Sequence, residues 1–301
     1  MNKIKKNAGG IQVFTAGAIW GTIGLFITQL NRCGSNSMMT SLLRVLFAFI
    51  IMAVITSVKS GLKSFKINGR TLISCALLGI ICHGIYNVFY SIAVVSTGVT
   101  ISAVLLNIAP VFTALTSRII FSEKLTPVKI LAIAVNVIGC ILAVTGGDIS
   151  LSGLSVTGVL FGIGAGFCYA LTAIIGRIAG SKADAFVIST YSYLFAALFL
   201  MLFIKPMNTE FSFNHGMIIW GFLFALIPTS IAYIIYYKGV QKISESSKVP
   251  VYASVETIVA AVLGVLIMHE NIGAVNIFGI ALVIFSIVLM NSRSKSGQTA
   301  S

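Results

Sequence analysis

The sequence predicts an all-α integral membrane protein with ten transmembrane helices. Of its 301 residues, 57% are hydrophobic and only 9% are charged, whereas soluble proteins carry about 25% charged residues. Long uncharged apolar runs recur along the whole chain, and a run of about 20 residues crosses a bilayer as a helix. Ten such helices leave only short connecting segments, which excludes a soluble catalytic domain.

Uncharged apolar runs define the ten expected helices in order. The first run follows Lys3, Lys5 and Lys6 in the manner of a signal peptide, but it has full span length and no small-residue cleavage site follows it. We therefore expect it to be retained as a helix. The ten helices are expected at residues 11–30, 37–58, 71–95, 99–121, 127–146, 154–176, 185–204, 216–237, 249–268 and 272–290.

The positions of the basic residues test this division independently of hydropathy. The net charge is +13, which in a soluble protein would suggest a nucleic-acid partner. With the N-terminus inside, Arg32 and Lys205 fall outside, Arg44 lies within a span, and the other 17 of the 20 basic residues are cytoplasmic, as the positive-inside rule requires. The charge therefore indicates a multi-pass protein of the cell inner (cytoplasmic) membrane with both termini cytoplasmic, and no nucleic-acid partner is expected. The cytoplasmic set is Lys3, Lys5, Lys6, Lys59, Lys63, Lys66, Arg70, Arg118, Lys124, Lys129, Arg177, Lys182, Lys238, Lys242, Lys248, Arg293 and Lys295.

The chain also contains an internal repeat. A shift of 147 residues aligns 76–143 with 223–290 without a gap and matches Tyr86 to Tyr233, Tyr90 to Tyr237 and Glu123 to Glu270. Because each half has five helices, the second half would enter the membrane from the opposite side, giving an inverted-topology repeat with a substrate site between the halves. The expected domains are residues 1–147 and 148–291, followed by a disordered cytoplasmic tail at 292–301.

Three ionisable side chains, Arg44, His83 and Glu256, lie in the interior of the expected spans, where charge is costly, and away from the span ends, so each is a candidate for function. Glu256, about 12 Å into the ninth helix, could bind a proton, pair with a cationic substrate, or tie two helices together. Arg44 could attract a carboxylate or phosphate, or be fixed to backbone carbonyls or to Glu256. His83, with Asn87 four residues on, could move protons or be a hydrogen-bonded interior residue.

Aromatic residues in the spans could line a cavity, although each could equally be a packing or interfacial residue. Glu123 and Glu270 stand at helix ends, where a carboxylate caps free N–H groups. Two glycine stripes, at 158, 162 and 166 and at 17 and 21, allow close helix approach. The aromatic candidates are Trp20, Tyr86, Tyr90, Tyr169, Tyr191, Tyr233 and Tyr237.

Proline marks where helices could bend. Pro110 interrupts the fourth helix and Pro228 the eighth, so each is a candidate hinge that frees a carbonyl. The five cysteines show no CxxC or Cys/His spacing, so we expect no metal site and no cofactor.

One combination of features is specific. A proline-containing helix, a Glu at the turn after it and a following small-residue helix occur together, twice. They lie in YSIAVVSTGVTISAVLLNIAPVFTALTSRIIFSEKLTPVKILAIAVNVIGCILAV (90–144) and YYKGVQKISESSKVPVYASVETIVAAVLGVLIMHENIGAVNIFGIAL (236–282). Together with AIWGTIGLF (18–26) and SLLRVLFAF (41–49), these stretches make the chain resemble the drug/metabolite transporter superfamily, in its ten-helix EamA-type branch.

The match has local departures. Ser122 precedes Glu123 and His269 precedes Glu270 where the family pattern favours Gly, and Thr257 stands where Pro often follows the Glu of the ninth helix. These departures weaken inferences about the turns and leave the resemblance over the chain intact.

The resemblance implies a secondary transporter, not an enzyme: an exporter of a small polar or amphipathic, amino-acid-like metabolite that works by alternating access, with proton coupling left open. No G-x-x-x-x-G-K-[ST] loop for ATP occurs. One alternative is a flippase of lipid-linked substrates. The other, a membrane-embedded lipid-modifying enzyme, is disfavoured because the acids and histidines of the outer loops are scattered. The implied partners are a small-molecule substrate and the lipid bilayer, and a homodimer stays open.

Overall fold

The computed structural model describes residues 3–148, 155–181, 183–203, 214–268 and 273–292, and that part of the chain is helical without strands. Nine of its helical stretches are long and apolar enough to cross a membrane, and each coincides with an expected span. The expected seventh span is the apolar helix Ala185–Met201, which has 17 residues and is shorter than the others, so the tenth crossing stays a prediction. Of the expected tail at 292–301, Ser292 is the last residue of the helix Ala274–Ser292, and the rest lies outside the described residues.

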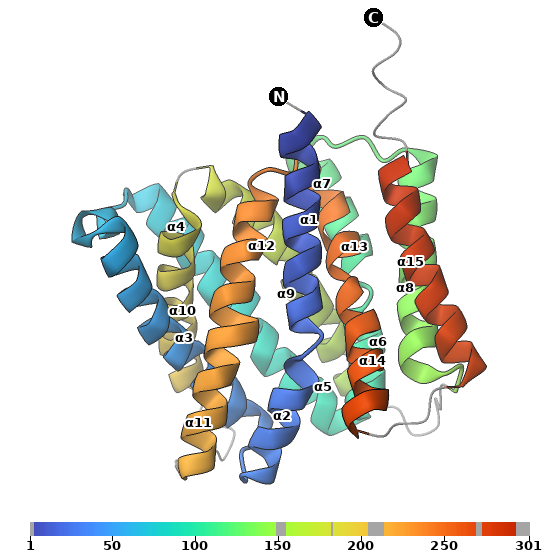
Figure 1. The fold of residues 1–301 in the computed structure, drawn as a ribbon, viewed down its shortest axis with the longest axis horizontal. Helices are drawn as coiled ribbons and strands as arrows, with labels where there is room; N and C mark the ends of the chain where they lie inside the picture. The colour runs from blue at the N-terminus through green and yellow to red at the C-terminus, as the bar shows by residue number, and fades with distance from the viewer. Residues whose placement is uncertain (1–2, 149–154, 182, 204–213, 269–272, 293–301) are drawn as a thin grey trace, which may run out of the picture.

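The helices lie side by side in one bundle, and several spans are built from two or three pieces (Figure 1). The start of α1 and the end of α15 lie at the same end of the bundle (Figure 1), as an even number of crossings requires. Which end faces the cytoplasm stays a prediction. In chain order the pieces are α1 (Lys3–Trp20), α2 (Ile23–Arg32), α3 (Ser37–Ser60), η1 (Leu62–Phe65), α4 (Gly69–Leu77), η2 (Leu78–Ile85), α5 (Tyr86–Thr97), α6 (Val99–Leu106), α7 (Ala109–Phe121), α8 (Pro127–Thr145), α9 (Val156–Gly180), α10 (Ala185–Met201), α11 (His215–Phe224), η3 (Ala225–Ile231), α12 (Ala232–Val240), η4 (Ser246–Lys248), α13 (Val249–Ala253), α14 (Val255–Met268) and α15 (Ala274–Ser292).

Irregular backbone recurs at the spacing of the sequence repeat. The π-helical segment η2 begins at Leu78 and its counterpart η3 begins at Ala225, 147 residues later. The break between α6 and α7 begins at Asn107, and the break between α13 and α14 falls at Ser254, again 147 residues later. These spacings support the alignment of the two halves. Their inversion relative to each other stays a prediction.

Two prolines lie at these irregular segments. Pro228 is inside η3 and has no N–H for the carbonyl of Phe224. The segment is π-helical, which places Thr229 opposite that carbonyl, and the hydroxyl of Thr229 donates to it at 2.9 Å. Pro110 stands near the start of α7, and likewise it cannot donate to the carbonyl of Leu106.

The glycine stripes lie where helices meet. A Cβ built on Gly17 would lie 2.5 Å from the carbonyl oxygen of Ala253, and one on Gly21 would lie 2.5 Å from Val259. Gly162 of α9 meets Leu105 in the same way, at 2.4 Å. The prediction of close helix approach at both stripes is therefore confirmed.

Candidate functional site

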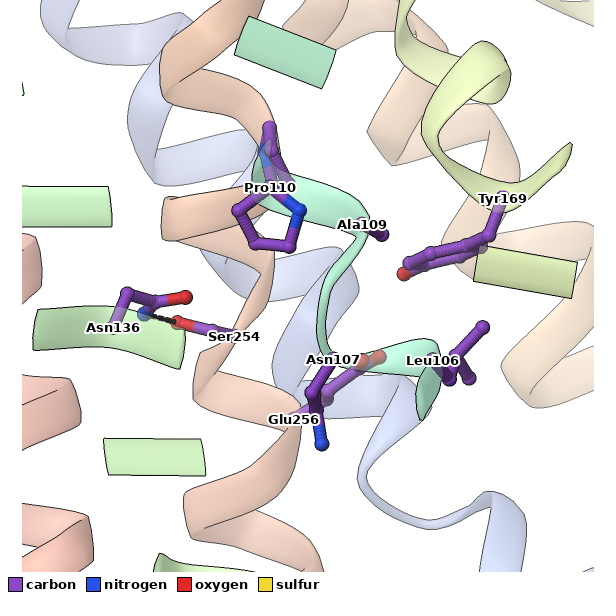
Figure 2. Close-up of a pocket in the computed structure, with 9 residues that line it drawn as sticks. Leu106, Asn107, Ala109, Pro110, Asn136, Tyr169, Ser254 and Glu256 are labelled. Atoms are coloured by element: carbon purple, nitrogen blue, oxygen red, sulfur yellow. Dashed lines mark hydrogen bonds between the residues drawn. The ribbon is translucent and has the colours of Figure 1, made fainter. Parts of the chain in front are cut away.

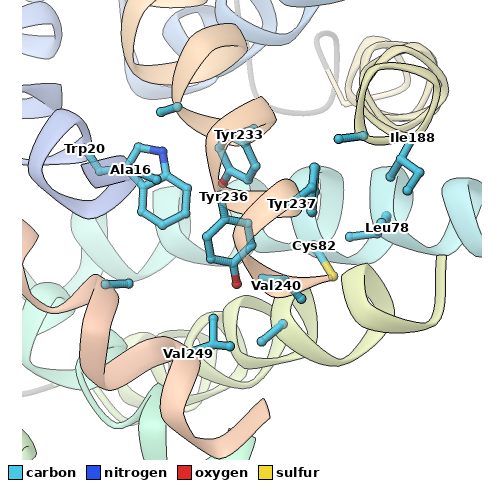
Figure 3. Packing of buried hydrophobic residues seen from close by; sticks show 14 of the residues in the cluster. Ala16, Trp20, Leu78, Cys82, Ile188, Tyr233, Tyr236, Tyr237, Val240 and Val249 are labelled. Carbon is cyan, nitrogen blue, oxygen red and sulfur yellow. The ribbon is translucent and has the colours of Figure 1, made fainter. Parts of the chain in front are cut away.

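Aromatic side chains from both halves of the sequence gather around the break between α1 and α2. Trp20 at the end of α1 has its ring centroid 4.9 Å from that of Tyr233, 5.0 Å from Tyr236 and 6.5 Å from Tyr169. Figure 3 shows Trp20 beside Tyr233 and Tyr236. Tyr86 adds to the group at 5.9 Å from Tyr169 and 5.9 Å from Tyr90. We call the six side chains the aromatic cluster: Trp20, Tyr86, Tyr90, Tyr169, Tyr233 and Tyr236.

Of the other two predicted aromatic residues, Tyr191 lies away from this cluster, and Tyr237 packs at its edge, 5.7 Å from Tyr233 and 5.5 Å from Tyr236 between ring centroids. The hydroxyl of Tyr191 donates to the carbonyl of Phe65 at 2.7 Å, which ties α10 to the short helix η1. Tyr237 is fully buried and faces His83. The cluster includes Tyr236, which the sequence did not single out because no repeat match points to it.

His83 and Asn87 are both buried, and both side chains form hydrogen bonds. The Nε2 atom of His83, in η2, is 3.3 Å from the hydroxyl of Tyr237, and its ring packs edge-on against Tyr233 at 4.9 Å. Asn87 donates to the carbonyl of His83 and accepts a 2.9 Å hydrogen bond from Ser41 of α3. These bonds connect α3, α5 and α12 around the aromatic cluster.

Arg44 is held by the kinked eighth span. Its Nε donates to the Oγ1 atom of Thr229 at 2.9 Å, and its guanidinium carbon lies 5.0 Å from the centre of the Phe224 ring. Arg44 and Glu256 form no ion pair with each other. The Arg44–Glu256 ion pair, one of the alternatives from the sequence, is therefore absent. Arg44 is held by the hydrogen bond to Thr229.

Glu256, in the first turn of α14, lines a small cavity at the breaks of the fourth and ninth spans (Figure 2). The space available to the centres of water-sized atoms is about 20 Å³, enough for a water molecule or an ion of similar size. The other polar side chains around it are Asn107, Asn136, Tyr169 and Ser254.

Sequence reasoning missed Asn107, Asn136 and Ser254. The repeat contained a signal for two of them, because Asn107 and Ser254 are 147 residues apart and both stand at helix breaks. Asn136 had the weaker signal of a polar amide within a span.

The two charged candidates act on the same aromatic cluster. Tyr86 and Tyr233 each lie within electrostatic range of both Arg44 and Glu256. Tyr169, which lines the small cavity, lies within electrostatic range of Glu256 as well. The cluster is thus flanked by one basic and one acidic side chain.

Glu123 lies at the helix ends and joins the two halves of the chain. Its Oε1 is 2.7 Å from Nη1 of Arg177 and accepts the backbone N–H of Ser246 at 2.6 Å, while Oε2 accepts the backbone N–H of Ser247 at 3.3 Å. The carboxylate therefore binds the free N–H groups at the start of the ninth span. The helix that follows Glu123 is capped by Thr126 instead. Glu270 lies outside the described residues.

A second ionic group lies at the same end. Glu245 is 2.6 Å from Nζ of Lys129 and 2.6 Å from Nζ of Lys248. Burial alone would raise the pKa of Glu245, but the hydrogen bonds and positive charges of the two lysines outweigh it and lower the pKa below its usual value. Its pair with Lys129 also joins the second half of the chain to the first.

Comparisons with known proteins agree with this architecture. The chain is 24% identical to the uncharacterized inner membrane transporter YicL of Salmonella typhimurium, over 95% of this chain and 96% of that protein. It is 21% identical to an uncharacterized transporter of Archaeoglobus fulgidus, over 93% and 95%. A crystal structure that is 13% identical shares the fold with a TM-score of 0.81, over 95% of this chain and 97% of that chain.

The model of the EamA-like transporter family matches the chain twice, over residues 7–145 and 156–292. The two matches together cover most of the chain, one in each half. With the membrane-spanning helices and the relatives named as transporters, this identifies a multi-pass transporter, and the chain belongs to the EamA-like transporter family.

Proposed function

We propose that this transporter exports a small polar or amphipathic, amino-acid-like metabolite across the cell inner membrane by alternating access of two inverted five-helix halves. The observation that carries the proposal is the aromatic cluster flanked by Arg44 and Glu256. A zwitterion has a carboxylate suited to the arginine and an ammonium group suited to the glutamate and to the faces of the tyrosines. The site residues come from both halves, as a site between two moving halves requires.

Proton coupling through Glu256 is part of the proposal. The carboxylate has no basic partner among the ion pairs of the described residues, and it borders a cavity with room for water. A carboxyl group in that position can take up a proton on one side of the membrane and release it on the other.

Flux in proteoliposomes tests both parts of the proposal. Purified protein is reconstituted and offered a panel of amino acids, with and without a proton gradient. We expect Glu256→Gln to abolish gradient-driven flux, while exchange of substrate for substrate continues, because the amide cannot carry the proton. Asp148→Asn, an exposed carboxylate outside the helices, is the matched control and keeps wild-type flux. Normal gradient-driven flux by Glu256→Gln would show that Glu256 does not couple transport to the proton gradient.

A comparison of two classes of substrate tests the role of Arg44. Arg44→Ala is assayed with amino acids and with the corresponding amines, which lack the carboxylate. We expect the variant to lose transport of the amino acids at least about tenfold more than transport of the amines, because it removes a charge-assisted hydrogen bond to the carboxylate. An equal loss for both would show that Arg44 only holds the eighth span through Thr229.

A further inference from the structure

We propose that one edge of the bundle, formed by α3, η1 and α4 at the end where Glu123 lies, binds the headgroups of anionic phospholipids. Basic side chains gather at this edge, four of them exposed and one half-buried. The inference concerns a lipid partner at the rim of the protein, so it does not depend on the proposed substrate. We call these five side chains the basic patch: Lys59, Lys63, Lys66, Arg70 and Lys238.

The basic residues at this end of the bundle fall into a paired group and an unpaired group. Lys129, Arg177 and Lys248 each lie within 2.7 Å of a carboxylate oxygen of Glu123 or Glu245. No residue of the basic patch forms an ion pair within the described part of the chain. The positive-inside rule accounts for basic residues at one end of a membrane protein, but not for this separation. The patch therefore carries positive charge that the described protein groups do not neutralise.

Two lysines of the patch lie over one aromatic ring. Lys59, in the last turn of α3, and Lys238, in the last turn of α12, have their Nζ atoms 5.1 Å and 4.6 Å from the centre of the Phe186 ring. Asp184 is close by in sequence, but its Oδ1 accepts the backbone N–H of Phe186 at 3.1 Å, and it pairs with neither lysine. Like charges held beside one ring repel each other, and a bound anion would relieve this repulsion.

The lysines of η1 are held near the same helix, α10. The hydroxyl of Tyr191 in α10 donates to the carbonyl of Phe65 at 2.7 Å, and the two rings meet edge-on at 6.3 Å. Lys63 and Lys66 stand on either side of Phe65 and are both exposed. Because η1 is fixed to α10, their charges stay at the edge where Phe186 lies.

Exposed apolar side chains extend from the patch along the membrane-spanning helices. On α4, Arg70, Ile73 and Leu77 have the i, i+3, i+7 spacing of one helix face, and all three are exposed. Next to the patch, Val58 is 81% exposed and Leu62 is 76% exposed. A phospholipid matches this arrangement, because its acyl chains lie beside apolar faces while its phosphate lies at the level of the basic residues. The combination favours a lipid over a soluble anion.

Native mass spectrometry of the purified protein tests the patch. Protein in detergent is titrated with phosphatidylglycerol, which is anionic, or with phosphatidylcholine, which is neutral overall. We expect a lower Kd for phosphatidylglycerol. The double variant Lys63→Gln, Arg70→Gln should raise that Kd at least about tenfold, because two charges at the headgroup level are lost. Both side chains are exposed and outside the ion pairs of the described residues, so the variant should fold.

The matched control is the double variant Arg118→Gln, Lys124→Gln. Both side chains are exposed and form no ion pair within the described residues. They lie at the end of α7 and just before α8, and Figure 1 shows α8 on the opposite side of the bundle from α3. The control removes the same charge from the same end of the protein, and it should keep the wild-type Kd for phosphatidylglycerol.

Three results would overturn the patch. Equal affinity of the wild type for the two lipids would show that the lipid charge is not recognised. Equal Kd values for the patch variant and the control variant would show that the patch residues have no special part in binding. Displacement of phosphatidylglycerol by an equal concentration of glycerol phosphate, its water-soluble counterpart, would show that the patch binds a free phosphate and not a lipid.

The outcome is independent of the proposed function, because the titration contains no transport substrate. Phosphatidylglycerol binding through the patch without flux of any amino acid would support this inference and reject the proposed substrate. Conversely, amino-acid flux by a protein that does not distinguish the two lipids would leave the transporter proposal intact and reject the lipid site.

Discussion

Thr229 performs two tasks at one kink. Its hydroxyl donates to the carbonyl of Phe224, to which Pro228 cannot donate, and its oxygen accepts the Nε–H of Arg44. The backbone carbonyl of Thr229 in turn accepts a 3.4 Å hydrogen bond from Tyr193. The position of Arg44 beside the aromatic cluster therefore depends on the proline kink of the eighth span, although the two lie 185 residues apart in sequence.

Thr229→Val tests this dependence with almost no change in shape. We expect the variant to lose about 1 kcal/mol of stability, since both hydrogen bonds of a fully buried hydroxyl disappear. The measurement is the unfolding temperature in detergent. Thr116→Val is the matched control: Thr116 also donates to a carbonyl one turn back, that of Phe112, but no proline withholds the helical donor there. A drop of the same size in both variants would contradict the special role of Thr229.

At the residue scale, the sequence indicated which side chains are unusual but not which of them meet. Arg44, His83 and Glu256 stand out because charge is rare in an apolar span. The partner of Arg44 does not stand out: Thr229 is an ordinary polar residue until the fold brings distant helices together. Tyr236 was missed for a similar reason, because only packing distinguishes it from its neighbours Tyr233 and Tyr237.

At the element scale, the prolines revealed some helix breaks and not others. The irregular segments at Pro110 and Pro228 follow from a missing N–H group. The breaks after Trp20 and at Ser254 were not predicted, since the sequence shows no comparable local cause. There Gly17 and Gly21 of the first span bring its backbone close to the carbonyls of Ala253 and Glu256, so contacts between helices, which a linear sequence does not reveal, accompany these breaks.

Gly17→Ala tests how tightly the first span packs on the ninth. A Cβ at this position would lie 2.5 Å from the carbonyl oxygen of Ala253, a backbone atom that cannot move easily. We expect a loss of about 1–3 kcal/mol in stability, as for other overpacked positions, measured as a lower unfolding temperature. The control is Gly24→Ala, because nothing lies within 4 Å of a Cβ there; its gain in helix propensity should leave stability equal or higher. Equal effects of the two variants would contradict close packing at Gly17.

At the scale of the whole molecule, ionic groups connect the two family repeats at one end of the bundle. Glu123 in the first repeat binds Arg177 and the start of the ninth span in the second, while Lys129 in the first binds Glu245 in the second. Under the proposed alternating access, in which one half moves against the other, these pairs must break when that end opens. The chain in this structure therefore has its halves tied at the Glu123 end.

Acid should loosen this tie. Because the folded-state pKa of Glu245 is lowered, its contribution to stability is fully present above its ordinary pKa of 4.5 and is lost as the pH falls through the lowered folded value. We expect the unfolding temperature of the wild type to fall more steeply between pH 5 and pH 3 than that of Glu245→Gln, which cannot be protonated. Parallel pH profiles for the two proteins would contradict a stabilising role of the lysine pairs in the folded state.

Removing both ionic groups should open that end of the transporter. Cys82 is 1% exposed in the core cluster that contains Trp20 and Tyr237, so a maleimide reaches it only when the helices separate. In a chain whose other four cysteines are alanine, we expect the double variant Glu123→Gln, Glu245→Gln to raise the rate of Cys82 alkylation by about tenfold, because losing about 1.4 kcal/mol of closing energy shifts the open population by that factor. Alkylation is measured by mass spectrometry in reconstituted protein, with reagent on the Glu123 side only. Asp148→Asn serves again as the control that leaves the rate unchanged. An unchanged rate in the double variant would mean that packing between the repeats, and not these ion pairs, holds this end closed.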